Sequence, residues 1–306
     1  MQKSNFKSYL LLHLIVFIWG FTAVLGDLIS VREAALVWYR MGLAGIFLLI
    51  YALIVKKPLK LPMKEAAKII FVGFLIAIHW IFFFRAINIS NVSITLAMFS
   101  MGAFFASILE PIVYKRRMLW YEVVFGLVII AGLFVIMQVE MHYLEGIISA
   151  LFSVFVGVMF TLFNGKLIHK HDSVVIATYE FFAGFAFVTI YLLLAGKFNA
   201  EFFDVSTKDW FYIIILSSIC TAYAFTAAVA VMRELSPYTV MLTTNLEPVY
   251  GIILAFFILG ESEKMSVPFY IGAVVILITV ILNGIVKNRA DKKLLRKASI
   301  PNAPIN

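Results

Sequence analysis

The sequence predicts an all-α integral membrane protein with ten transmembrane helices, arranged as two inverted five-helix repeats. Three observations lead to this fold class. The composition is 63% hydrophobic and only 14% charged, the apolar residues fall into ten long runs, and the chain matches itself weakly at an offset of 146 residues. Soluble domains carry about a quarter charged residues, so this chain lacks the polar side chains that a water-soluble globule needs.

The ten runs are each long enough to cross a membrane as a helix. Crossing a hydrocarbon core of about 30 Å takes about 20 mostly apolar residues. The runs are continuously apolar and lack the alternation of a membrane β-barrel, so helices are predicted. They cover residues 8–26, 32–55, 66–88, 92–114, 119–138, 144–168, 174–196, 209–232, 237–260 and 266–286.

Lysine and arginine residues are divided unevenly between alternate loops. One side holds 19 of the 25, and the other holds only Arg32, Lys197, Lys208 and Lys264. Short cytoplasmic loops carry the excess of positive charge. We therefore expect a multi-pass protein of the cell (inner) membrane with both termini in the cytoplasm, ending in a basic, frayed tail over residues 287–306.

The charge and cysteine content exclude several other classes. The formal net charge is +8, but the basic residues sit in short clusters between apolar runs, so a nucleic-acid partner is not expected. A single cysteine, Cys220, excludes a disulfide framework and a cysteine-based zinc site. His169 and His171 lack a third ligand. We expect no metal and no cofactor.

The internal match divides the chain into residues 1–138 and 139–286, followed by the tail. Gly126 falls on Gly272 at the offset of 146, and Tyr39 meets Tyr179 when the offset is relaxed by a few residues. Each half holds five spans. Because five is odd, the second half must lie upside down relative to the first. An inverted repeat is typical of secondary transporters, whose substrate site lies near the midplane between the halves.

Three stretches resemble a known family. They are Trp19-Gly20-Phe21, Trp38-Tyr39-Arg40, and LEPVYGIILAFFILGE over residues 246–261. They are similar to the EamA-type family of the drug/metabolite transporter superfamily, over residues 8–286. The resemblance implies an inner-membrane carrier with a central cavity that commonly exports amino acids, other small metabolites or drugs. The second half has Pro248 and, at the end of the same span, Glu261, whereas the first half has Gly102 and Lys115 at the corresponding positions. Any role that the family gives to the glutamate at the helix end therefore carries over only to Glu261.

Glu247, in the middle of the ninth span, is the main candidate for function. A carboxylate near the bilayer centre costs about 2.5 kcal/mol or more and by default marks a transport pathway or a proton relay. Pro248 removes one backbone donor and frees a carbonyl group one turn earlier. The alternative is a protonated glutamate that hydrogen-bonds between helices. Residues at spacings of four share its helix face: Thr239, Thr243, Gly251 and Ala255.

Arg40 lies deep in the second span, and several uses of it stay open. It could pair with Glu247 or with Glu180 across the repeat interface. It could instead bind the carboxylate of an anionic or zwitterionic substrate, for which guanidinium offers a two-pronged fit. Snorkelling to the outer interface is the third alternative, and it is the one we expect for Arg85.

The remaining candidates are polar or aromatic residues inside spans. His79 titrates near neutrality and could exchange a proton with a cavity, or it could bond to a neighbouring helix. Asn164 and Asn245 could orient a substrate. The aromatic candidates could line a cavity for moderately apolar organic molecules or simply fill helix contacts. These are Trp19, Tyr39, Trp80, Tyr179 and Tyr223.

These features favour a secondary active transporter, an exporter of small organic metabolites that works by alternating access. Its expected partners are a small-molecule substrate, the lipid bilayer and protons as a candidate coupling ion, and the protein is expected to be a monomer or a weak homodimer. The alternative is a membrane-embedded enzyme acting on a lipid or isoprenoid. The sequence holds no HExxH, Asp-rich or P-loop motif that would support such an enzyme or nucleotide-driven transport.

Overall fold

The computed structural model describes residues 2–115 and 120–298, and all regular structure in these two ranges is helical. Each of the ten predicted runs falls on helix. Eight helical segments in the described ranges are long and apolar enough to cross a membrane, and the apolar helices at Val124–Ile136 and Val267–Thr279 are shorter. The helical class is therefore confirmed, whereas the count of ten spans stays a prediction.

Five of the spans are single helices. They are α1 (Gln2–Leu28), α2 (Glu33–Ile54), α3 (Met63–Ile89), α7 (Leu144–Leu167) and α8 (Ser173–Leu194). The two shorter apolar segments belong to α6 (Trp120–Val139) and α14 (Val267–Ala298). Small helices connect the spans at η1 (Met141–Tyr143), α9 (Ala200–Phe203) and η3 (Gly260–Glu263).

The fourth and ninth spans are each broken near their middle. The fourth consists of α4 (Val92–Phe99) and α5 (Gly102–Tyr114), and the ninth of α12 (Pro237–Thr244) and α13 (Glu247–Leu259). The prediction of continuous runs over 92–114 and 237–260 was therefore wrong at these points. Pro248 explains the second break, because it has no N–H to donate to the carbonyl of Thr244 one turn earlier.

The two breaks occupy corresponding places in the two halves. Under the offset of 146, Ser100 falls on Leu246, and each lies in the two-residue interruption of its span. Discontinuous helices at matching positions are where transporters place their binding sites, because the ends of half-helices expose unpaired backbone groups. The breaks therefore direct attention to the space between them.

The eighth span contains a different irregularity. It runs as α10 (Thr207–Ser217), a π-helical segment η2 (Ser218–Tyr223) and α11 (Ala224–Val231). A π segment inserts an extra residue into the helix and re-aims its backbone and side chains, frequently at a functional site.

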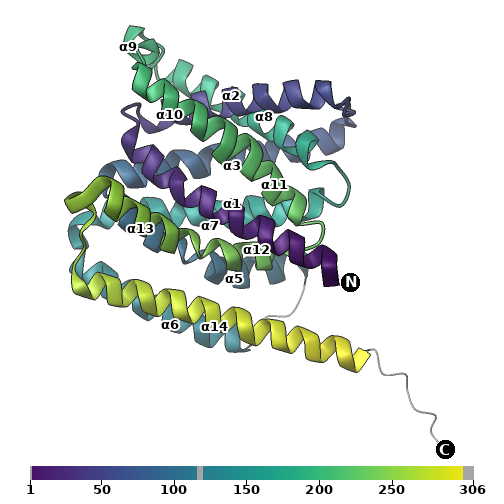
Figure 1. Cartoon of the computed structure of the whole chain (residues 1–306), viewed down its shortest axis with the longest axis vertical. Helices are drawn as coiled ribbons and strands as arrows, with labels where there is room; N and C mark the ends of the chain where they lie inside the picture. Colours follow the sequence, from purple (N-terminus) through teal and green to yellow (C-terminus); the bar gives the residue numbers. More distant parts are fainter. Residues whose placement is uncertain (1, 116–119, 299–306) are drawn as a thin grey trace, which may run out of the picture.

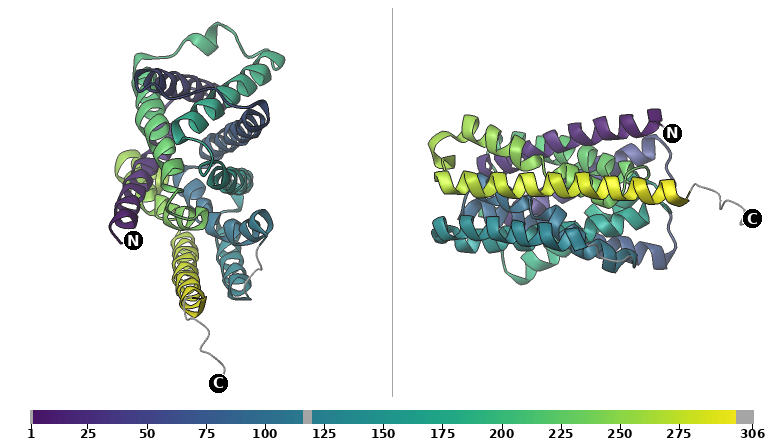
Figure 2. Two further views of the ribbon diagram at one scale, coloured as in Figure 1. Left: turned by 90° about the vertical axis from the view of Figure 1, so that its right-hand side faces the viewer. Right: turned by 90° about the horizontal axis from the view of Figure 1, so that it is seen from below.

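The helices run alongside one another in one bundle, and α1 begins at the same end at which α14 finishes (Figures 1 and 2). The contacts between the two halves are reciprocal. In each half the first span packs against the broken span of the other half, as α1 on α13 and α7 on α4, while α2 packs on α8 and α6 on α14. Such an exchange of contacts is what a two-fold relation between the halves produces.

Helices α6 and α14 form a pair along one edge of the bundle (Figure 1). They come close at Gly132 and Gly272, where a Cβ added to Gly272 would lie 3.0 Å from the carbonyl oxygen of Gly132. The structure also corrects the expected frayed tail, because α14 continues through residues 287–298 as helix. Residues 299–306 of that predicted tail lie outside the described ranges.

Helices α3 and α8 come close together at Gly73. A Cβ at Gly73 would lie 2.3 Å from the carbonyl oxygen of Glu180 and 2.9 Å from the Cβ of Ala183. A larger residue at position 73 would therefore push α8 away from α3.

We predict that Gly73→Val destabilises the protein by about 1–3 kcal/mol, the usual cost of overpacking. The measurement is thermal unfolding in detergent, with Ala67→Val as the control because Ala67 is exposed on the same helix. Equal melting temperatures for the two variants would show that α3 and α8 do not depend on this contact.

Candidate functional site

A cavity of about 100 Å³ lies between the two halves, beside both helix breaks. This volume is below the roughly 300–1,000 Å³ of most small-molecule sites. A metabolite-sized ligand would therefore require the halves to move apart. The cavity is lined by Trp19, Thr22, Arg40, His79, Trp80, Phe83, Phe99, Val154, Gly157, Phe160, Thr161, Asn164, Phe225, Ala228, Val229, Met232, Val240, Met241, Thr244 and Glu247.

Arg40 is the largest buried polar side chain of this cavity, with 2% of its surface exposed. Its Nε donates a hydrogen bond to Thr221 Oγ1 at 2.6 Å. Its guanidinium carbon lies 3.8 Å from the centre of the Trp80 ring, which attracts the cation electrostatically. Among the described residues Nη1 has no hydrogen-bond partner. The guanidinium is thus bonded through Nε, and its Nη1 is buried with hydrogen-bonding capacity unused.

Glu247 faces the same cavity from the first turn of α13, and 6% of its surface is exposed. Arg40 and Glu247 attract each other electrostatically. Within the described ranges they are not among the ion pairs closer than 4.0 Å, so the attraction acts across the cavity. The arrangement leaves both groups able to meet a ligand placed between them.

The π segment η2 explains how Arg40 is held. Thr221 donates its hydroxyl hydrogen to the carbonyl of Leu216, five residues earlier, and accepts from Arg40. The carbonyl of the neighbouring Cys220 accepts a hydrogen bond from Trp19 Nε1 at 3.2 Å. The irregular backbone therefore supplies polar partners to α1 and α2. Sequence reasoning missed Thr221, because helical periodicity does not reveal a π insertion.

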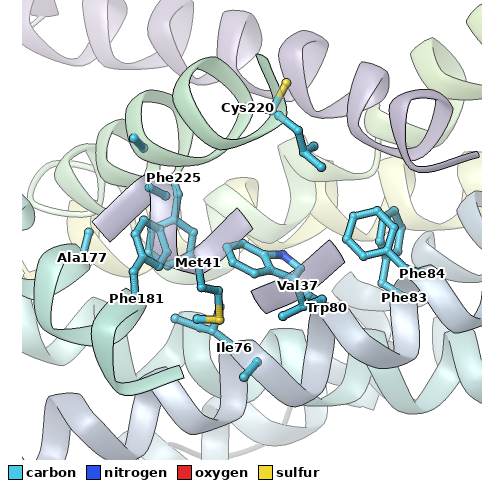
Figure 3. Close-up of a cluster of buried hydrophobic side chains, with 14 of the residues drawn as sticks. Val37, Met41, Ile76, Trp80, Phe83, Phe84, Ala177, Phe181, Cys220 and Phe225 are labelled. Atoms are coloured by element: carbon cyan, nitrogen blue, oxygen red, sulfur yellow. The ribbon is translucent and has the colours of Figure 1, made fainter. Parts of the chain in front are cut away.

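His79 and Trp80 follow each other on α3 but do different things. His79 Nδ1 lies 2.8 Å from the carbonyl oxygen of Ser153 on α7, so the ring is fixed to a neighbouring helix, and it also lines the cavity. Trp80 packs between aromatic groups: Phe181 and Phe225 lie on one side of it and Phe83 and Phe84 on the other (Figure 3).

Asn164 lies between the cavity and Glu180. Asn164 lines the cavity from α7, and Glu180 is buried behind it on α8; within the described residues none of the side-chain polar atoms of Asn164 or Glu180 has a hydrogen-bond partner. Glu180 itself is fully buried and is not a lining residue. Of the two glutamates suggested as partners of Arg40, only Glu247 attracts it electrostatically in this structure.

Four predicted site residues lie away from the cavity. Tyr39 stacks on Phe202 and donates to the Phe202 carbonyl, which ties it to the connection before α10. Tyr179 donates to the carbonyl of Leu59. Tyr223 is 48% exposed, and the side chain of Asn245 bonds back to the Met241 carbonyl to close the end of α12. None of these four residues lines the cavity, and for the three tyrosines the alternative of helix packing is the one that agrees with this arrangement.

The structure adds lining residues that sequence reasoning passed over. Phe83, Phe99, Phe160 and Phe225 form much of the apolar wall. Nothing in the sequence separates them from the many phenylalanines that face lipid. Thr244 could have been found, because its carbonyl is the one that Pro248 leaves without a helical donor.

Two further observations concern Arg85 and the candidate metal ligands. Arg85 does not only snorkel, because its guanidinium forms an ion pair with Glu145. The described residues contain no group of three or more His, Cys, Asp or Glu side chains that could hold a metal ion.

The comparison with protein families is decisive for identity. The model of the EamA-like transporter family matches the chain twice, over residues 6–138 and 144–285. The chain belongs to the EamA-like transporter family. The resemblance seen in the sequence is thereby confirmed, and so is a two-repeat, multi-pass membrane architecture.

A solved structure shares the overall fold of this EamA-family chain. This structure, described only as a crystal structure of a protein, superposes with a TM-score of 0.66 over 90% of this chain and 97% of that chain, at 15% sequence identity. At that identity the similarity shows the fold alone. No curated protein matches the sequence.

Ion pairs join the two halves of this EamA-family protein at the end of the bundle where α1 begins, called the basic end below. Lys57, after α2, pairs with Asp172, before α8, at 2.7 Å. His171 lies 3.3 Å from Glu65 of α3. Partial burial raises the pKa of Asp172, but hydrogen bonds from Lys57 and the Val174 N–H outweigh it and hold the pKa below the usual 3.8.

We predict that Asp172→Asn lowers the melting temperature by about 2 °C at neutral pH, a typical effect for a partly exposed pair. A carboxyl group with a lowered folded-state pKa stabilises the fold above its unfolded pKa, and this contribution disappears as the pH falls through the folded pKa. The gap to wild type should therefore close below about pH 4. A gap that persists well below that pH would contradict the ion-pair explanation, and Asp204→Asn at an exposed position is the control.

We also predict that Arg40 and Thr221 are energetically coupled. A double-mutant cycle of Arg40→Met and Thr221→Val should give a coupling free energy of about 1.5–3 kcal/mol, as for a hydrogen bond to a charged group. The measurement is unfolding in mixed detergent. The control cycle pairs Arg40→Met with Thr161→Val, because the Thr161 hydroxyl bonds to Gly157 on its own helix. Equal coupling in both cycles would remove the role of Thr221.

Proposed function

We propose that this EamA-family protein is a secondary active transporter that exports small organic metabolites, such as amino acids or related compounds and drugs. It works by alternating access, with two inverted five-helix halves moving about the central cavity. One observation carries the proposal: the cavity between the halves, beside two interrupted helices, holds a buried arginine and a buried glutamate that are not in direct contact.

The chemistry of the lining supports an amphipathic organic substrate. The unpartnered Nη1 of Arg40 suits a carboxylate or another anionic group. The aromatic wall formed by Trp19, Trp80 and neighbouring phenylalanines suits an apolar moiety. Because Arg40 is already stacked on Trp80 and bonded to Thr221, little side-chain freedom would be lost when it binds a substrate.

Glu247 is the proposed coupling residue. A carboxylate inside a membrane bundle is costly when ionised and is stabilised by a nearby cation. A substrate anion that engages Arg40 would weaken the attraction between Arg40 and Glu247, so proton binding to Glu247 and substrate binding to Arg40 are linked. The energy would come from the proton gradient or from the gradient of the solute.

The reciprocal contacts between the halves support the proposed motion. Each half places its first span against the broken span of the other, so a rocking of one half would open the cavity to one side while closing the other. In the proposed orientation the basic end, which carries the excess of lysine and arginine, faces the cytoplasm of an inner-membrane protein together with both termini.

Reconstitution in liposomes tests the function. Saturable uptake that is accelerated by substrate on the opposite side indicates a carrier. Flux that does not saturate would indicate a pore, and chemical turnover would indicate an enzyme. A thermal-shift screen against amino acids, nucleosides and amphipathic drugs supplies the substrate, because a ligand that binds only the folded form raises the melting temperature.

We predict that Glu247→Gln lowers the accumulation of substrate driven by a pH gradient by about tenfold or more. Substrate exchange should be partly retained, because the glutamine keeps the size of the side chain and Arg40 keeps its contacts. The matched control is Glu261→Gln, whose carboxylate is exposed and pairs with Lys264. Unchanged pH-driven accumulation in Glu247→Gln would remove this residue from the mechanism.

A further inference from the structure

A second hollow lies outside the central cavity, at the basic end of the bundle. It is a groove of about 760 Å³ between α3 and α7 that ends at Tyr114, the last residue of α5. We call it the α3–α7 groove. It is lined by Glu65, Ala67, Lys68, Phe71, Val72, Tyr114, Phe163, Gly165, Lys166, Leu167, His169 and Lys170.

The deeper part of the α3–α7 groove is apolar. Phe71 from α3 and Phe163 from α7 meet edge to face, with ring centres 6.1 Å apart. Half of the Phe71 side chain is nevertheless exposed. In a bundle surrounded by hydrocarbon, an exposed apolar wall of this kind is a surface for an acyl chain.

The rim of the groove is cationic. It carries Lys68, Lys166 and Lys170, together with His169, and all four are exposed. The one acidic lining residue, Glu65, is occupied by Lys68 at 2.7 Å and by His171 at 3.3 Å. Lys166 and Lys170 form no ion pair closer than 4.0 Å with a lining residue, although Lys170 also attracts the Glu65 carboxylate from a greater distance.

Lys166 is fixed in place at this rim. Its ammonium group donates to the carbonyl of Val113 at 2.7 Å and lies 5.1 Å from the centre of the Tyr114 ring. An ammonium group has three donors, so two stay available for an anion. Lys170 follows four residues later along the chain, at the turn that ends α7, and adds a second charge on the same rim.

We propose that the α3–α7 groove binds an anionic phospholipid. The phosphate lies on Lys166 and Lys170, and an acyl chain runs over Phe71 and Phe163. Charge complementarity selects the anionic class, since basic pockets between membrane helices bind such headgroups. A zwitterionic headgroup would bring its own cation to the lysines, and a free phosphate would leave the apolar wall without a partner.

The position of the groove gives the lipid a role. Its two walls belong to different halves of the chain, and α3 and α7 form the most extensive helix contact in the described bundle. A lipid that touches both walls therefore favours the arrangement of the halves seen here. This inference does not depend on which substrate is carried, and its test does not require transport.

The test is a thermal-shift measurement of the purified full-length protein in neutral detergent, with added phosphatidylglycerol or phosphatidylcholine. Phosphatidylglycerol well above its dissociation constant should raise the wild-type melting temperature by about 5 °C more than phosphatidylcholine. Lys166→Gln/Lys170→Gln should lose most of this difference. Lys166→Arg/Lys170→Arg should keep it, because the charges remain.

The matched control is Lys56→Gln/Lys60→Gln, which removes two exposed charges from the loop between α2 and α3 and none from the groove. It should respond like wild type. If both glutamine double variants lose the shift equally, the effect is general attraction to the basic end and the proposed site is wrong. If sn-glycerol 3-phosphate gives the same shift as the lipid, the lipid assignment is wrong.

A folding defect in the double variant would not hide the answer. Lys170→Gln alone leaves the Lys166 bond to Val113 in place and should reduce the lipid-specific shift by about half. An undiminished shift in this folded single variant would overturn the proposal.

Discussion

A guanidinium group buried inside a membrane bundle must be given partners, and much of the central architecture of this protein meets that requirement. Arg40 cannot stay in the interior without compensation, because an isolated buried charge is costly. The π segment supplies Thr221, α3 supplies the Trp80 ring, and α13 places Glu247 across the cavity. Each of these three contributions comes from a different span, so the position of Arg40 fixes how the spans pack.

The irregular parts of the helices are also where polar groups gather. The break before α13 leaves the Thr244 carbonyl without a helical donor, and the π segment directs the carbonyl of Cys220 toward Trp19. Regular transmembrane helices satisfy all their backbone groups internally and offer none to a ligand. The concentration of interruptions around one cavity is therefore what distinguishes this site from the rest of the bundle.

The sequence predicts the helices well because length and continuous hydropathy suffice to define a span. It also predicts that Arg40, Glu247, His79, Trp80, Trp19 and Asn164 matter, and all six line one cavity. It could not show the π segment or the break at Ser100, which has no proline to signal it. It could not decide between cavity lining and helix contact for Tyr39 and Tyr179, because an aromatic residue beside polar ones can equally anchor a neighbouring connection, as both do here.

Arg40 and Glu180 occupy corresponding places in the two halves, directly after the matched Tyr39 and Tyr179, and they differ in sign of charge. If the two halves were identical, exchanging their conformations would turn one state of the protein into the other, and the two states would have equal free energy. Here one half presents a cation with several partners, and the other presents a buried carboxyl group without a hydrogen-bond partner among the described residues. In the proposed alternating-access cycle, this difference between the halves would give the empty molecule a preferred resting direction.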